Sequence, residues 1–141
     1  MTDYIVDNSA WARFAAGDPG VVVALRRIER APADLIVTCP PQVLEICHSA
    51  RTPAEHDVLR ETLDLFFPVE HHPGEPEVLA LQSALGKAGM VRAAGPRDLH
   101  IAAYALANRA TVLTCDHDFE HIAAVSELDV EYIAPHDQSR T

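Results

Sequence analysis

The sequence predicts an α/β fold: a three-layer sandwich in which helices flank a mostly parallel sheet of about five strands. Five short β-rich apolar runs recur at wide intervals, and helical patterns fill the gaps between them. Strands that alternate with helices are typical of parallel sheets, and continuous apolar runs are typical of strands buried on both faces. The 141 residues suffice for one such core, so we predict a single domain over residues 1–141.

Each apolar run predicts one strand. The runs are Tyr4–Val6, Leu35–Cys39, Phe66–Val69, Thr111–Cys115 and Val130–Ile133. Pro68 lies inside the third run, and proline cannot donate a hydrogen bond to a neighbouring strand. We therefore expect the third strand at an edge of the sheet.

Helices are predicted between these strands. Apolar spacing and capping residues place them after Asp18–Pro19, after Pro40–Pro41, over Thr52–Phe66, over Glu77–Ala88, over Arg97–Asn108 and over Phe119–Val125, with a further short helix over Ser9–Phe14 if Asp7 caps it. In the Thr52–Phe66 helix we expect Val58, Leu59, Thr62 and Phe66 to form the buried stripe.

The charge balance excludes one broad class of function. Twenty-one acidic residues against eleven basic ones give a formal net charge of −10, which argues against a protein that coats polyanions non-specifically. A metal site, a basic partner or simple solubility remain open. The three cysteines form no C-x-x-C pair, which indicates reduced core residues in a cytosolic protein. Neither a signal peptide nor a membrane span is apparent.

Two acidic residues follow predicted strands directly, namely Asp7 and Asp116. Parallel sheets form their sites at the carboxyl ends of strands, where the strand order reverses. Either residue also suits a helix cap, so each taken alone leaves both roles open. Asp98 favours function more clearly, because apolar residues at positions 101, 102 and 105 put it on the core-facing side of its helix. An unpaired charge is costly there.

Glu45 gives a different signal. It lies roughly opposite the apolar stripe of Val43, Ile46 and Cys47, so periodicity alone predicts a solvated surface glutamate.

Several segments together resemble a known family. V-D-N-S-A-W at the start, Glu45 on an early helix, G-P-R-D-L-H-I-A-A-Y-A, and V-L-T-C-D-H-D-F-E-H-I are similar to the PIN-domain ribonucleases, in particular the VapC-type toxins of bacterial toxin–antitoxin systems. The resemblance covers nearly the whole chain. It implies a metal-dependent endoribonuclease of the cytoplasm, usually a homodimer, that cleaves RNA and is held inactive by a cognate antitoxin whose C-terminal part occupies the cleft.

The same resemblance implies a set of site residues. The catalytic and metal-binding acids fall on Asp7, Glu45, Asp98 and Asp116, with Asp118 as an auxiliary ligand and Ser9 as the hydroxyl residue that supports the first aspartate. Asn8 departs from the pattern, since these toxins often have threonine there. Hard cations such as Mg²⁺ or Mn²⁺ prefer oxygen ligands, which suits a ring of carboxylates.

An acidic protein that binds RNA needs a local basic rim, because its net charge repels phosphates. Arg13, Arg51 and Arg97 are the candidates, since each is close in sequence to a predicted site acid.

Three other interpretations compete with this one. The string His117-Asp118-Phe119-Glu120-His121 matches the H-x-x-E-H pattern of a zinc protease, although it begins in a turn. A receiver-like phosphoacceptor domain also has acids at strand ends, but it needs a lysine after a late strand, and the one lysine, Lys87, precedes the fourth strand. A non-catalytic PIN-like interaction domain is the third alternative.

Overall fold

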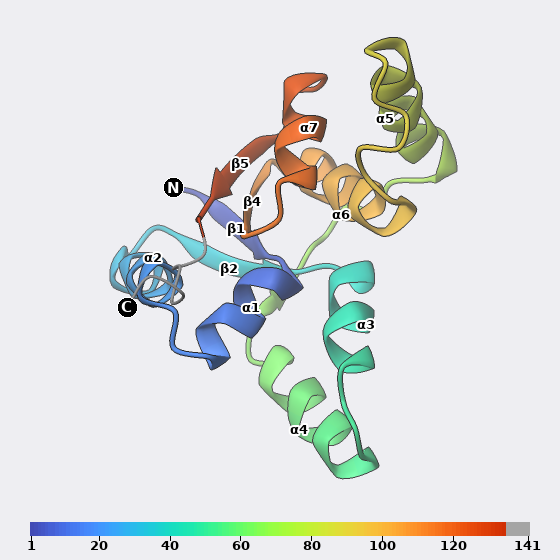
Figure 1. The fold of residues 1–141 in the computed structure, drawn as a ribbon. Helices are drawn as coiled ribbons and strands as arrows, with labels where there is room; N and C mark the ends of the chain where they lie inside the picture. Colours follow the sequence, from blue (N-terminus) through green and yellow to red (C-terminus); the bar gives the residue numbers. More distant parts are fainter. Residues whose placement is uncertain (135–141) are drawn as a thin grey trace, which may run out of the picture.

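A five-stranded sheet, parallel throughout, forms the centre of the computed structural model, which describes residues 1–134 (Figure 1). The strand order is β3-β2-β1-β4-β5. The strands are β1 (Asp3–Val6), β2 (Leu35–Thr38), β3 (Phe67–Pro68), β4 (Ala110–Thr114) and β5 (Asp129–Tyr132). All five predicted strands are therefore present, and the strand that contains Pro68 lies at an edge, as expected.

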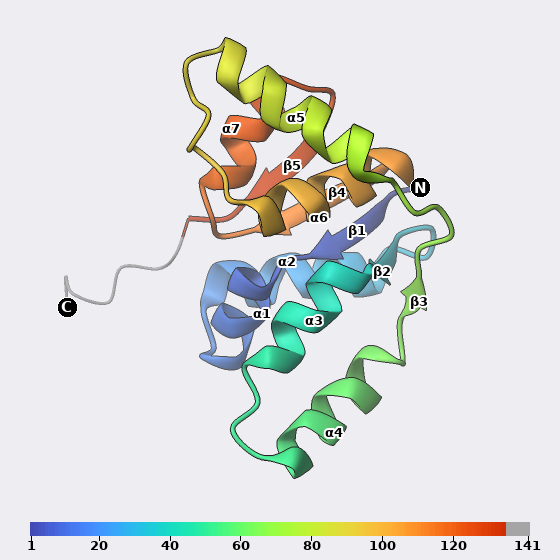
Figure 2. The same ribbon diagram turned by 90° about the vertical axis from the view of Figure 1, so that its right-hand side faces the viewer.

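Helices connect consecutive strands, as parallel pairing requires. Within residues 1–134 they are α1 (Asn8–Ala15), α2 (Pro19–Arg30), α3 (Pro40–His48), α4 (Pro53–Leu63), α5 (Glu75–Lys87), α6 (Pro96–Ala107) and α7 (Asp118–Ala124). Helices α5, α6 and α7 lie together on one side of the sheet, and α1 and α2 lie on the other (Figures 1 and 2). This is the predicted three-layer arrangement.

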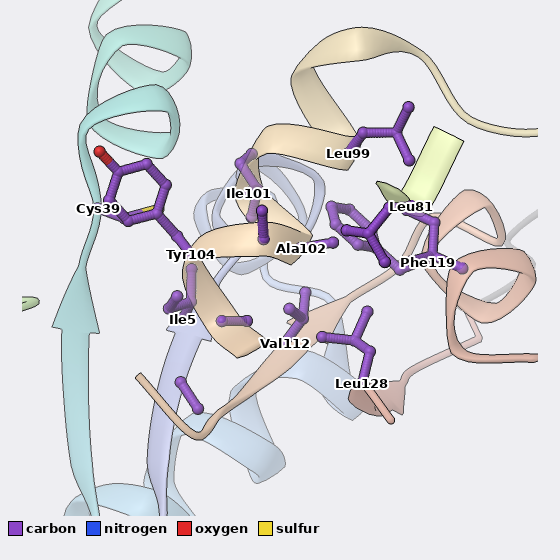
Figure 3. Packing of buried hydrophobic residues seen from close by; sticks show 14 of the residues in the cluster. Ile5, Cys39, Leu81, Leu99, Ile101, Ala102, Tyr104, Val112, Phe119 and Leu128 are labelled. Carbon is purple, nitrogen blue, oxygen red and sulfur yellow. The ribbon is translucent and has the colours of Figure 1, made fainter. Parts of the chain in front are cut away.

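Side chains of the central strands alternate between two hydrophobic cores. Ile5 and Val112 point toward α6, where they pack in the larger cluster with Leu99, Ala102 and other residues (Figure 3). Their neighbours in sequence point to the opposite face and pack against α1 and α2. Both faces of β1 and β4 are buried, which explains why their sequences show no alternation of polar and apolar residues.

Helices α3 and α4 form an arm that extends away from the sheet (Figures 1 and 2). A small third core joins them, built around Ile46, Cys47 and Leu63. The predicted stripe of α4 was partly wrong. Val58 is 61% exposed and Thr62 is exposed as well, whereas Leu59 and Phe66 are partly buried as predicted. Leu63 is the buried residue of α4, because it lies on the face that packs against Ile46 and Cys47 of α3.

The cysteines are all free thiols. Cys39 and Cys47 are buried, and Cys115 is partly buried. No helix within residues 1–134 has the length and apolar character needed to cross a membrane.

The topology fixes where a site can form. The chain builds β1, β2 and β3 in one direction across the sheet and then places β4 and β5 on the other side of β1. The connections that leave β1 and β4 therefore diverge, which opens a crevice at the carboxyl ends of these two strands.

Candidate functional site

Asp7 lies at the carboxyl end of β1 and caps α1. Its backbone N–H donates to the carbonyl of Leu113. The residue is 3% exposed and lies at the floor of the crevice. Oδ2 accepts hydrogen bonds from the hydroxyl of Ser9 at 2.7 Å and from its backbone N–H at 3.4 Å. Oδ1 is buried and has no hydrogen-bond partner. The helix cap thus uses one oxygen of the carboxylate and leaves the other without a partner.

Thr114 is a site residue that the sequence analysis missed. Its hydroxyl donates to Asp7 Oδ2 at 3.1 Å and accepts the backbone N–H of Asp116 at 2.9 Å. Thr114 is fully buried as the last residue of β4. The only available signal was its place in the T-C-D segment, one residue before the turn that carries Asp116.

Asp98 reaches the crevice from the opposite wall. It is the third residue of α6, and the residues below it on that face, Ile101, Ala102 and Ala105, are fully buried. The two alanines allow α6 to approach the sheet closely, which carries the carboxylate over the end of β1. The prediction of a core-facing Asp98 is confirmed.

Glu45 is not the solvated glutamate that periodicity alone predicted. Its side chain is 17% exposed, and its Oε2 is buried without a hydrogen-bond partner. Oε1 forms an ion pair with Arg97 at 3.2 Å. The face of α3 opposite the arm core turns toward α6, so it is buried by a second helix that the periodicity of α3 cannot reveal.

Gln42 holds α3 in this position and was also missed. The residue is fully buried. Its side-chain amide donates to the carbonyl of Val6 at the end of β1, while its Oε1 accepts the N–H of Cys39 at 3.1 Å. Because Gln42 precedes Glu45 by nearly one helical turn, this tether sets the distance between Glu45 and Asp7.

The carboxylates form two overlapping groups. Ligand oxygens of Asp7, Glu45 and Asp98 lie within 4.8 Å of one another, and so do those of Asp98, Asp116 and Asp118. Neither group includes a histidine or a cysteine, so the described part of the chain does not assemble a zinc-protease ligand set around His117 and His121.

The residues present fit a hard divalent cation. Two oxygens that face the crevice, Asp7 Oδ1 and Glu45 Oε2, are buried acceptors without donors. Such atoms cost free energy unless a cation or a donor meets them. An all-oxygen set is the coordination that Mg²⁺ and Mn²⁺ prefer.

The electrostatics point the same way. Burial first, and then the charges of Asp7, Asp116 and the other site acids, raise the pKa of Asp98 to about 7. Burial also raises the pKa of Glu45, with Asp7 adding to the effect and Arg97 opposing it. Burial raises the pKa of Asp7 despite the hydrogen bonds from Ser9 and Thr114. The fold therefore concentrates negative charge that is costly without a counter-ion.

Asp116 and Asp118 occupy the turn between β4 and α7. The N–H of Asp118 donates to Asp116 Oδ1 at 2.9 Å, and α7 begins at Asp118. His117, which lies between them, points its ring toward Tyr132, stacked at a centroid distance of 4.2 Å. The turn directs both aspartates toward Asp98 rather than into the solvent.

The three candidate arginines take different positions. Arg97 touches the site through Glu45. Arg51 is exposed in the turn between α3 and α4, and Arg13 is exposed in the last turn of α1.

The model of the PIN domain family matches residues 4–125, which is most of the chain. A comparison with curated proteins finds no significant match.

Solved structures of similar fold come from several bacteria. VapBC2 from Rickettsia felis, bound to a DNA fragment from its promoter, has a TM-score of 0.72 at 14% identity, over 94% of this chain and 99% of that one. VapBC-1 from nontypeable Haemophilus influenzae has a TM-score of 0.68 at 19% identity, over 93% and 98% of the chains. VapBC-5 from Mycobacterium tuberculosis, a member of a family of toxin–antitoxin systems, has a TM-score of 0.66 at 20% identity, over 94% and 100%. At these identities the likeness shows a shared fold and nothing beyond it.

Proposed function

The chain belongs to the PIN domain family, and on that premise we propose that it is a Mg²⁺- or Mn²⁺-dependent endoribonuclease that acts as the toxin of a toxin–antitoxin pair. One observation carries the enzymatic part: buried, unpartnered oxygens of Asp7 and Glu45 converge with Asp98 at the sheet's carboxyl edge. The family membership also replaces the receiver-like interpretation.

In this proposal Asp7, Glu45, Asp98 and Asp116 hold the metal, and Asp118 assists. A bound divalent cation supplies charge neutralisation at the phosphate and an activated water. The protein supplies the positioning. Ser9 and Thr114 fix the rotamer of Asp7, so that one oxygen stays directed into the crevice.

In the metal-free protein, burial and the neighbouring carboxylates raise the pKa of Asp98 to about 7. A divalent cation held by Asp98 would favour the charged carboxylate and lower this pKa. Binding of the cation near neutral pH would therefore release a proton from the site. Glu45, whose Oε2 is buried without a hydrogen-bond partner, would complete the ligand set or orient the water.

In the same proposal, Arg97 binds the phosphate of the substrate. Its guanidinium is 59% exposed and stands beside Glu45, so it reaches a phosphate at the mouth of the crevice without leaving the site. A guanidinium binds phosphate oxygens in a bidentate manner, which orients the scissile group.

The likeness to VapBC proteins supports the toxin role. The antitoxin that we propose brings a basic segment into the acidic crevice, where an arginine pairs with carboxylates in place of the metal. We expect such a segment to compete with Mn²⁺. An RNA substrate puts the site of action in the cytoplasm.

The test is cleavage of a fluorescent single-stranded RNA by the purified chain with Mg²⁺, with Mn²⁺ and with EDTA. Cleavage should require the cation and should fall at least 100-fold in Asp7→Asn and Asp116→Asn. Asp57→Asn, in an exposed position of α4, is the matched control. Cleavage that survives EDTA or both site variants would contradict the proposal. A folded, metal-binding chain without cleavage would favour the non-catalytic interaction domain.

A further inference from the structure

Two hollows follow helix α3 away from the acidic crevice. The first, of about 540 Å³, lies between α3 and the start of α6, and its lining includes Glu45, Arg97 and His100. The second, of about 500 Å³, continues to the start of α4, and its lining includes Arg51 and His56. Leu44 and His48 line both hollows, so the two adjoin along α3. We refer to this surface, defined by these seven residues, as the α3 track.

The charge of the α3 track is opposite to that of the molecule as a whole. The chain has 21 acidic residues and a net charge of −10. Yet Glu45 is the one acid that lines either hollow, and it is already paired with Arg97. The other titratable linings are two arginines, three histidines and the buried thiol of Cys47. A surface that is locally basic on an acidic protein attracts anions selectively.

The side chains of the track are available for a ligand. Among the described residues the guanidinium of Arg51 takes part in no ion pair, since the nearby carboxylate of Glu55 accepts the backbone N–H of Arg51 instead. Leu44, on the wall that the hollows share, is 71% exposed. Single-strand binding surfaces combine cationic groups with flat rings on which bases stack, and the three histidines of the track supply such rings.

We propose that the α3 track binds the single-stranded RNA that flanks the scissile phosphate. Arg97 and Arg51 bind backbone phosphates, and His48, His56, His100 and Leu44 contact bases. Helix α3 has nine residues and is therefore ~13 Å long, which matches about four stacked nucleotides at 3.4 Å each. The inference rests on the proposed ribonuclease function, because continuity with Glu45 is what makes RNA the occupant.

Binding tests the track independently of cleavage. The probe is a fluorescein-labelled 12-nucleotide single-stranded RNA of mixed sequence, titrated by anisotropy in EDTA with the full chain. We expect Arg51→Ala to raise Kd about fivefold and to reduce the salt slope by ~0.7, the value for one phosphate contact on a single strand. His56→Ala should raise Kd with an unchanged salt slope. Arg26→Ala, an exposed arginine of α2 that lines neither hollow, is the matched control and should change Kd less than twofold.

Equal effects of Arg51→Ala and Arg26→Ala on Kd, or no effect of either, would contradict RNA binding by the α3 track. Light scattering on Arg51→Ala tests whether a second copy of the chain occupies this surface instead. A mass half that of the wild type, together with lost RNA binding, would make this face an interface between two copies. The two proposals also fail separately. Absence of cation-dependent cleavage by the wild type, with Arg51-dependent RNA binding intact, would contradict the nuclease alone. Cleavage that depends on the site acids, with RNA binding indifferent to Arg51, would contradict the track alone.

Discussion

The hydroxyl groups of Ser9 and Thr114 lie 3.1 Å apart, although the two residues are 105 positions apart in the sequence, and both donate to the same oxygen of Asp7. Each hydroxyl also accepts a backbone N–H, Ser9 from Cys115 and Thr114 from Asp116. Those N–H groups occupy the acceptor side of the hydroxyls and direct their protons toward Asp7. The pair therefore joins the ends of β1 and β4 and keeps Oδ1 of Asp7 free.

Thr114→Val should weaken both the fold and the proposed metal site. The change keeps the shape of a buried side chain but removes one donor to Asp7 and the acceptor for the N–H of Asp116. Leaving such a group unpaired costs about 1–3 kcal/mol, and losing support behind a ligand costs ~10-fold or more in metal affinity. Thermal melts and Mn²⁺ calorimetry measure the two effects. Thr111→Val, in the same strand, is the control, and equal effects of the two changes would contradict this role.

Gln42→Met should displace Glu45. The substitution preserves volume but leaves the carbonyl of Val6 without its donor in a buried position, at a cost of about 1–3 kcal/mol. With the tether gone, α3 is free to shift, so we expect cleavage to fall more than RNA binding does. Gln82→Met on α5 is the control. Unchanged cleavage in a destabilised Gln42→Met protein would show that the tether does not position the site.

The sequence predicted the sheet, its edge strand and the acids at strand ends, because these depend on local runs and on a general rule for parallel sheets. The buried position of Asp98 was predictable for the same reason, because the apolar residues that follow it on one face of its own helix are local in the sequence. Glu45 was not, because the helix that covers it, α6, is distant in sequence. Gln42 and Thr114 were missed because their polar partners are distant in the sequence. These partners are the carbonyl of Val6, at the end of β1, and the carboxylate of Asp7, which follows it. The metal-binding roles of the acids remain predictions.

Asp98 should make the metal-free protein less stable as pH rises. In the unfolded chain an aspartate ionises near pH 4, whereas in the fold the pKa of Asp98 is about 7. Below pH 4 both states are neutral at this position, and stability is at its full value. Between pH 4 and pH 7 only the unfolded state gives up the proton, so stability is lost across this window and stays low above it.

Asp98→Asn isolates this contribution. In EDTA the variant should differ little from the wild type near pH 4 and exceed it by about 2 kcal/mol near pH 8, which is less than the full linkage because Asp98 is partly exposed. Mn²⁺ should reverse the order at pH 8. Melts at both pH values, with the exposed Asp57→Asn as control, provide the measurement. A stability difference that does not depend on pH would mean that Asp98 ionises in the fold as it does in water.

Exposed apolar residues on the α3–α4 arm predict self-association. Val58 and Leu65 are 61% and 81% exposed, and Val58 and Leu59 border an apolar hollow of about 480 Å³ on α4. A two-fold dimer would cover this surface with its own copy. We expect a dimer mass by light scattering at micromolar concentration, and a monomer mass for Val58→Glu. Val23→Glu, equally exposed on α2, should remain dimeric. A monomeric wild type would exclude the dimer.

Asp116→Asn separates repulsion from capping. Asp98, Asp116 and Asp118 place three ligand oxygens within 4.8 Å of one another, so each charge raises the energy of the others. The N–H of Asp118 donates to Asp116 Oδ1, and an asparagine keeps that acceptor. The metal-free variant should therefore be more stable than the wild type by ~1 kcal/mol. With Mn²⁺ at 100 times its Kd, the wild type should gain about 2.7 kcal/mol by mass action, and the variant much less. Paired melts in EDTA and in Mn²⁺ test both differences. Equal Mn²⁺ responses would remove Asp116 from the metal site, and a less stable metal-free variant would leave it only the capping role.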